Sequence, residues 1–220
     1  MVAGHLGPQV ARPGVGGMSR HEHTAGRGDV STGVLTFPRG AAGLVIRAEQ
    51  APDRLFTARF QGAQPAVSAA GGTVRIHYRY SHHRTHGAVA LARAVIWTVQ
   101  IQGGARDVDA DLTEVPLASF DIDEGASLVS LRMPTPAGWV PIRIGGGASH
   151  VTIVRPPSAG ARLRVMRGAA DLVIDERHIG AVGGQIRRES PPAGGAGGYD
   201  ISVGAGANHV TVTTTASTSG

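Results

Sequence analysis

One stretch of the chain decides the fold: residues 140–154, which read VPIRIGGGASHVTIV. Apolar and polar residues alternate on both sides of the central glycines, with Val140 and Ile144 before them and Val151 and Ile153 after them. A period of two is typical of a half-buried β-strand, and glycines between two such runs indicate a tight reversal. The stretch therefore predicts one unit of strand, turn and strand.

The turn signature of this stretch occurs six times in the chain. The copies, each a Gly-Ala pair followed by an apolar position, are Gly40-Ala41 with Leu44, Gly104-Ala105 with Val108, Gly125-Ala126 with Leu128 and Val129, Gly147-Ala148 with Val151, Gly168-Ala169 with Leu172, and Gly206-Ala207 with Val210. Four successive glycines, from Gly104 to Gly168, are separated by 21, 22 and 21 residues. A fixed period of this size indicates stacked structural units. We therefore predict an all-β, single-domain β-solenoid or sandwich of stacked two-strand repeats of about 21 residues.

The glycines of the repeat have a structural explanation and a functional alternative. A tight reversal needs a positive φ or a close backbone approach, which a Cβ penalises, and the small alanine that follows suits a place where stacked turns meet. The alternative is a phosphate-binding loop, but a dinucleotide fingerprint needs a helix after its glycines, and here strands follow. The glycines are therefore interpreted as turn residues.

Four segments together resemble a known group of bacterial domains. They are Trp97–Ala105, Phe120–Ser127, Val140–Ser149 and Tyr199–Ala207. They are similar to toastrack-type β-repeat domains, which include the C-terminal domain of LiaF-like envelope-stress regulators and a bacterial adhesin repeat family. The resemblance covers about residues 95–215 and, more loosely, residues 34–80. It implies a stack of antiparallel strands and brings no catalytic residues with it.

The chain also departs from that group. LiaF-like regulators carry membrane helices ahead of this domain, whereas here another β segment and a polar tail precede it. The polymer-forming bactofilins are a second comparison, but the resemblance is only that of a small glycine-rich solenoid.

The domain boundaries follow the periodicity. Residues 1–30 hold glycine, proline, histidine and arginine without a period, so we predict a disordered tail. The β-repeat domain is predicted over residues 31–215, with a divergent part at 31–90 and regular repeats at 95–215, and residues 216–220 form a disordered end. The last strand of the repeat, Val210–Thr215, carries neither charge nor proline, and we expect it at an exposed end of the stack.

Composition excludes several classes of protein. None of the 220 residues is cysteine, so disulfides, thiolate metal sites and thiol nucleophiles are absent. All 21 basic residues are arginine, a bias that suggests GC-rich codons and a high-GC bacterium, and it weakens any argument from the net charge of +5. The arginines are spread along the sequence, whereas nucleic-acid patches are clustered with interleaved aromatics, so no nucleic-acid partner is expected.

The chain has no apolar run of signal-peptide or membrane-span length. We therefore predict a cytoplasmic protein without direct membrane insertion. A missing upstream segment would leave the same sequence, so that alternative stays open.

Two groups of residues are candidates for metal binding or catalysis. His82, His83 and His86 are spaced to ligate a metal, but they lack a carboxylate or fourth ligand, and a solvated loop is the alternative. The acidic group, which suggests a calcium site or a glycosidase pair, comprises Asp107, Asp109, Asp111, Glu114, Asp121, Asp123 and Glu124. Asp109 and Asp111 alternate with apolar residues, which predicts an outer strand face with cross-strand arginine pairs.

The sequence contains neither Gly-x-Ser-x-Gly nor His-Glu-x-x-His, so the usual markers of nucleophilic hydrolases and zinc hydrolases are missing. We predict no catalytic, cofactor-binding or metal-binding residues and no cofactor. The predicted function is a non-enzymatic protein-interaction or scaffold module, a monomer or homodimer, linked to envelope-stress regulation by the resemblance. The alternative is a self-associating, bactofilin-like structural protein, and a carbohydrate-active enzyme is a third hypothesis. The sequence does not identify the protein partner.

Overall fold

The computed structural model describes residues 20–62, 64–78, 86–192 and 197–215. Within these ranges the chain forms nineteen strands in two sheets and no helix, which confirms the predicted all-β repeat architecture. The described part of the chain thus contains no helix that could span a bilayer.

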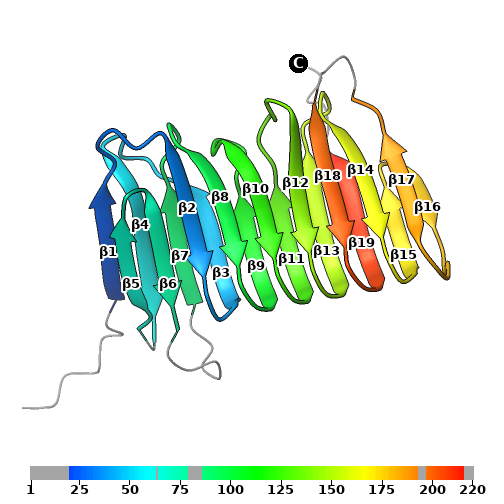
Figure 1. Ribbon diagram of the computed structural model, residues 1–220, viewed down its shortest axis with the longest axis horizontal. Coiled ribbons are helices and arrows are strands. Elements are labelled where there is room, and N and C mark those ends of the chain that lie inside the picture. The colour runs from blue at the N-terminus through cyan, green and yellow to red at the C-terminus, as the bar shows by residue number, and fades with distance from the viewer. Residues whose placement is uncertain (1–19, 63, 79–85, 193–196, 216–220) are drawn as a thin grey trace, which may run out of the picture.

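The two sheets face each other and both extend along the long axis of the molecule (Figure 1). The nine-stranded sheet has the spatial order β17 (Ile186–Ser190), β14 (Gly160–Val165), β18 (Gly198–Val203), β12 (Trp139–Ile144), β10 (Leu117–Ile122), β8 (Ile96–Ile101), β2 (Thr32–Phe37), β6 (Thr73–His77) and β5 (Ala66–Ala70). The ten-stranded sheet has the order β1 (Arg20–Gly26), β4 (Arg54–Gln61), β7 (His86–Leu91), β3 (Ala41–Ala48), β9 (Ala105–Asp111), β11 (Ala126–Arg132), β13 (Ala148–Arg155), β19 (Ala207–Thr214), β15 (Ala169–Ile174) and β16 (Arg177–Ile179).

Each coil of the solenoid crosses from the nine-stranded to the ten-stranded sheet through one Gly-Ala turn. The six turns therefore make six coils: β2–β3, β8–β9, β10–β11, β12–β13, β14–β15 and β18–β19. Because successive coils enter each sheet in the same direction, neighbouring strands in the interior of both sheets are parallel. The antiparallel stack implied by the resemblance is therefore wrong for the interior, and antiparallel pairs occur only toward the sheet ends.

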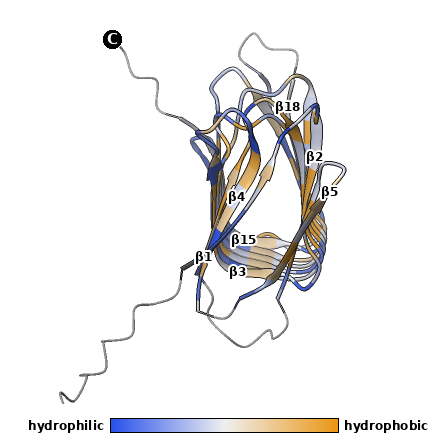
Figure 2. Ribbon diagram, turned by 90° about the vertical axis from the view of Figure 1, so that its left-hand side faces the viewer, coloured by the Kyte–Doolittle hydropathy of each residue, from blue (hydrophilic) through white to orange (hydrophobic). Residues whose placement is uncertain are grey.

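The core lies between the two facing sheets, whose apolar sides meet in the end-on view (Figure 2). The apolar position of the Gly-Ala repeat forms one row of neighbours across the ten-stranded sheet, which comprises Leu44, Val108, Val129, Val151, Val210 and Leu172. All six side chains are at most 2% exposed. Burying each such side chain contributes roughly 1.5–3 kcal/mol to the stability of the fold, so the main role of the repeat is to form this core.

The alanines of the repeat form a second row at the start of each ten-stranded-sheet strand. Five of the six alanine N–H groups donate to the glycine carbonyl of a neighbouring turn, for example Ala148 to Gly206 at 3.0 Å, and the sixth, Ala169, donates to the Val182 carbonyl at 2.9 Å. Of the six glycines only Gly40 and Gly168 have a positive φ. The positive-φ explanation is therefore wrong for the other four, at which an added Cβ would lie 3.3–3.6 Å from its nearest neighbour.

A third row is formed by residues in the left-handed conformation. The residue two positions after each repeat alanine has φ between 51° and 60°, and the row comprises Gly43, Asp107, Leu128, His150, His209 and Asp171. Alanine and the apolar residue three positions later both face the core, although strict alternation would place them on opposite faces. The left-handed residue is a β-bulge: it adds one residue to the strand, so that the alanine before it and the apolar residue after it both face the core. Its own side chain points outward.

The coils are not stacked in sequence order at the C-terminal end. β18 pairs in parallel with both β12 and β14, and β19 pairs in parallel with both β13 and β15 (Figure 1). The C-terminal coil therefore stands inside the stack, and the expectation that Val210–Thr215 forms an exposed end is wrong. Its uncharged strand is suited to the interior because both of its edges are paired.

The first coil shows the same arrangement at the other end of the molecule. β2 lies between β6 and β8, and β3 lies between β7 and β9. Beyond this coil the ten-stranded sheet ends in β1, whose residues Arg20–Gly26 pair with β4. The predicted tail of residues 1–30 is thus too long, because part of it is an edge strand, while residues 1–19 lie outside the described residues.

A buried ion pair joins the coils on either side of the inserted one. Arg155, the last residue of β13, is 2% exposed, and its Nη2 lies 2.9 and 2.7 Å from the two carboxylate oxygens of Asp175. The Ser190 hydroxyl donates to Asp175 at 2.5 Å, and Arg155 also donates to the Ala159 carbonyl. We call Arg155, Asp175 and Ser190 the clasp. It ties β13 to the end of β15 across β19, and to β17 of the other sheet.

A candidate binding site on the outer face of the nine-stranded sheet

The interior of the solenoid is filled by side chains of the apolar core. Among the described residues the buried polar or charged side chains are Thr36, Glu49, Thr57 and Arg155. Groups that can bind a partner are therefore gathered on the outer faces of the two sheets.

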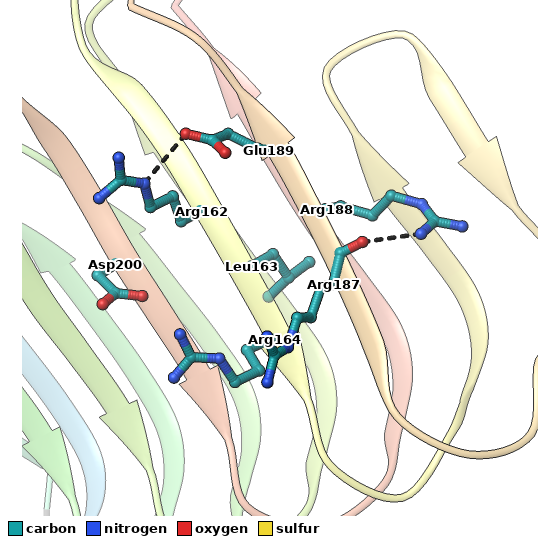
Figure 3. A pocket seen from close by; sticks show the side chains of 7 residues that line it. All are labelled: Arg162, Leu163, Arg164, Arg187, Arg188, Glu189 and Asp200. Atoms are coloured by element: carbon teal, nitrogen blue, oxygen red, sulfur yellow. Dashed lines mark hydrogen bonds and ion pairs between the residues drawn. The ribbon is translucent and has the colours of Figure 1, made fainter.

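Four arginines gather at the C-terminal end of the nine-stranded sheet. On β14, Arg162 and Arg164 alternate with the buried Leu163 and Val165, so both guanidinium groups point outward. β17 is antiparallel to β14 and places Glu189 opposite Arg162 and Arg187 opposite Arg164. Together with Arg188, Leu163 and Asp200 these residues line a pocket of about 270 Å³, which we call the arginine pocket (Figure 3).

One end of the arginine pocket is neutralised. Nε of Arg162 donates to a carboxylate oxygen of Glu189 at 3.0 Å. The same guanidinium lies 3.7 Å from the ring centre of Trp139 on β12, a cation–π contact that fixes its position. Arg162 is therefore already satisfied by its own neighbours.

The other end of the pocket carries unbalanced positive charge. Arg164 and Arg187 face each other across the strand pair, and neither side chain has an ion-pair or hydrogen-bond partner among the described residues. Figure 3 shows both side chains at the same end of the pocket, while Arg188 points away and donates to the Arg187 carbonyl at 2.8 Å. Like charges directly opposite each other in a sheet are destabilising.

Asp200 adds an acceptor at the side of the pocket. It lies on β18 in register with Arg162, and its Oδ1 is buried without a hydrogen-bond partner in the described structure. A buried acceptor without a donor carries a desolvation cost. The pocket thus combines two free guanidinium groups with an acceptor that lacks a donor.

Asp109 and Asp111 lie on the outer face of β9, as their alternation predicted. Asp109 lies 2.5 Å from Nη2 of Arg47 and 3.9 Å from Nη1 of Arg132, which confirms the predicted cross-strand pairs. Burial raises the pKa of the Asp111 carboxyl, but hydrogen bonds from Thr113 and the charges of two nearby guanidinium groups outweigh it, so its pKa lies below the ordinary value. These carboxylates are therefore charged partners of arginines in the neighbouring coils.

The remaining acids are spread over separate places. Asp121 pairs with Arg143 at 3.2 Å, and Glu114 pairs with Arg93 at 3.0 Å. The other three, Asp107, Asp123 and Glu124, are exposed. Within the described ranges no three histidine or acidic side chains are placed to hold one metal ion.

The histidine candidates are only partly within the described structure. His82 and His83 lie outside the described residues, and His86 is the first residue of β7, paired with Gln61 of β4. That these three histidines bind no metal therefore stays a prediction from the sequence.

A different histidine group occurs on the outer face of the ten-stranded sheet. His150 and His209, neighbours in the left-handed row, stack with ring centres 4.6 Å apart and planes 4° from parallel. Asp171, the next member of the row, lies 3.3 Å from His209 and 3.5 Å from His178. Sequence reasoning missed this group because the histidines are far apart in the chain, although each occupies the same position of the repeat.

Sequence reasoning also missed the arginine pocket. The alternation of Arg162 and Arg164 with apolar residues was a visible signal for an outer strand face. The pairing of β14 with β17 was not visible, and it is this pairing that turns arginines that look dispersed in the sequence into one group.

Comparisons with known proteins identify a shared fold but no family. No protein-family model matches the sequence, and no curated protein matches it. A solved structure of a proposed cell adhesion protein from Clostridium sporogenes is similar over 90% of this chain and 100% of its own, with 14% identity and a TM-score of 0.64. A proposed adhesin from Bacteroides fragilis is aligned over 90% of this chain and 97% of its own, with 6% identity and a TM-score of 0.34. At such identities the clostridial structure establishes a shared all-β fold.

Proposed function

We propose that this protein is a non-enzymatic interaction module that binds a protein partner through its outer faces. The observation that carries the proposal is the way the stack ends. All four terminal strands, β1, β5, β16 and β17, are antiparallel to their neighbours, and β4 is antiparallel to β7, whereas the strands of the Gly-Ala coils are parallel to one another. The parallel pairing of the coils therefore stops before each end of the stack, and this supports a repeat that does not continue from one molecule into the next.

The edge strands support the same proposal. β1, β16 and β17 carry charged side chains or histidines, including Glu22, Arg177 and Arg187, and charge on an edge strand discourages pairing with other copies. β5 is uncharged, so it is the edge through which two copies could associate. This arrangement favours a monomer or a closed dimer over the bactofilin-like polymer, which is the alternative.

We expect light scattering to give one small molecular mass, that of a monomer or a dimer, over a wide range of protein concentration. The polymer alternative requires the mass to rise steadily with concentration. Placing a lysine in β5, as Ser68→Lys, should convert any dimer into a monomer by adding charge to this edge. A mass that grows with concentration would contradict the proposed module.

For the partner we propose a protein of envelope-stress regulation in the cytoplasm, which the LiaF-like resemblance supports. Cell adhesion is the second candidate, supported by the fold shared with the clostridial protein. Protease treatment of intact cells separates the two. We expect this protein to stay intact until the cells are lysed, whereas cleavage on intact cells would favour adhesion and contradict the cytoplasmic proposal.

A further inference from the structure

We propose that the arginine pocket binds an acidic segment of a protein partner, with one carboxylate held between Arg164 and Arg187. The inference rests on the proposed function in taking a protein as the partner. It goes beyond it by assigning the contact site and the chemistry of the bound segment.

The charge arrangement favours a carboxylate at this place. Arg164 and Arg187 are directly opposite each other and have no acidic partner in the described structure. A carboxylate between them replaces a repulsive pair by two charge-assisted interactions, and the planar guanidinium fork matches the two carboxylate oxygens. The neighbouring cross-strand pair differs, because Arg162 already forms an ion pair with Glu189 at 3.0 Å.

The acceptor on Asp200 favours a peptide over a simple anion. Oδ1 of Asp200 is buried and lacks a donor, and it lies at the side of the same pocket. An acidic peptide offers backbone N–H donors next to its carboxylates, so it can satisfy Asp200 and the arginines together. The backbone of a nucleic-acid strand offers phosphates but no N–H donor beside them, so it would leave Oδ1 of Asp200 without a hydrogen bond.

The surroundings leave room for an extended segment. The pocket of about 270 Å³ corresponds to several water volumes, enough for an acidic side chain. β17 is the last strand of the nine-stranded sheet, so its outer edge has no strand partner in the described structure. An extended peptide can lie along such an edge and direct alternate side chains to one face, which is the face that carries Arg187.

The test is a calorimetric titration of the full chain with hexaglutamate capped at both ends, at low salt. We expect Arg164→Gln with Arg187→Gln to weaken binding at least tenfold. The matched control, Arg59→Gln with Arg93→Gln, removes the same charge from exposed ion pairs at the other end of the molecule and should change binding less than twofold. Equal weakening in both double variants would overturn the site, because it would show attraction by overall charge.

Two further ligands decide the chemistry. An oligothymidylate with six phosphates should bind more weakly than hexaglutamate, and tighter binding would overturn the peptide in favour of a nucleic acid. Inorganic sulfate should compete only at much higher concentration, and affinity equal to that of the peptide would show a site for any oxyanion and overturn the role given to Asp200.

Folding of the double variant is checked without ligand. Removing two facing positive charges should leave the melting temperature of the Arg164→Gln, Arg187→Gln chain at or above that of the wild type. A lower melting temperature would show that the two arginines already stabilise the free protein, and it would contradict the inference. If light scattering shows a fixed mass while the peptide fails to bind, this inference fails and the proposed module stands.

Discussion

Replacing Asp175 by asparagine is expected to lower the free energy of unfolding by about 3 kcal/mol. The substitution keeps the size of the side chain and tolerates the left-handed backbone at this position, where φ is 52°. It leaves the guanidinium of Arg155, which is 2% exposed, without its counter-charge. The expected cost lies at the lower end for a broken buried pair because Asp175 is itself 30% exposed.

Urea unfolding followed by circular dichroism measures this effect, with Glu114→Gln as the control. Glu114 pairs with Arg93 at 3.0 Å, and the two side chains are 57% and 42% exposed, so its loss should cost less than about 1 kcal/mol. Adding Arg155→Met to the Asp175→Asn chain should restore part of the lost stability, since it removes the unpaired buried charge. Equal losses for Asp175→Asn and Glu114→Gln would show that the clasp does not hold the coils together.

The second large effect is expected from a single methyl group in the last Gly-Ala turn. Replacing Gly204 by alanine should destabilise the protein by about 2 kcal/mol, because the added Cβ would overlap the carbonyl oxygen of Gly145 in the adjacent turn. Backbone atoms on both sides are fixed by the parallel pairing, since the Gly204 N–H donates to the Ile144 carbonyl at 2.8 Å. The turns must therefore move apart to admit the methyl group.

Gly206, two residues further along the same turn, provides the matched control. A Cβ added there would lie 3.6 Å from its nearest neighbour, the Gly168 carbonyl oxygen, which is an ordinary contact. Its φ is not positive, so Gly206→Ala should be neutral or slightly stabilising through the unfolded chain. Thermal unfolding of the two variants side by side tests the contrast, and a larger loss for Gly206→Ala would show that the wrong glycine of the turn has been identified as the tight one.

The strands could be predicted because their signal is local. Val95, Trp97, Val99 and Ile101 alternate with polar or exposed positions in the sequence, and all four are fully buried in the core. The Gly-Ala repeat identified all six turns for the same reason, since each copy lies within one short segment. Apolar burial and turn chemistry act over a few residues, and the sequence shows them directly.

The order of the coils could not be predicted from the same signals. Val210 and Val212 resemble the apolar positions of every other coil, so the repeat offers no preference for a neighbour. The choice depends on contacts between distant segments, such as Arg155 with Asp175, and on the reversal made by β16 and β17. The arginine pocket is a product of that reversal, because it brings Arg187 opposite Arg164.

The bulges could have been predicted from the spacing of the repeat. In every Gly-Ala copy the alanine and the core residue are three positions apart, an odd spacing that a regular strand cannot place on one face. The left-handed residue that lies between them in every copy corrects this mismatch, because it acts as a bulge. It also explains why His150 and His209 become neighbours, since both occupy the position that turns outward.

The position of the C-terminal coil determines when the molecule can be completed during synthesis. β18 and β19 leave the ribosome after all the other described strands, yet they separate β12 and β13 from β14 and β15. Until they emerge, the coils made before them have no permanent neighbour on one side, so a nascent chain cannot fold by adding coils in the order of translation. The solenoid is therefore completed by inserting its C-terminal coil between coils that are synthesised earlier. A polypeptide that stops short of Gly198 would be divided into two incomplete blocks rather than shortened by one coil.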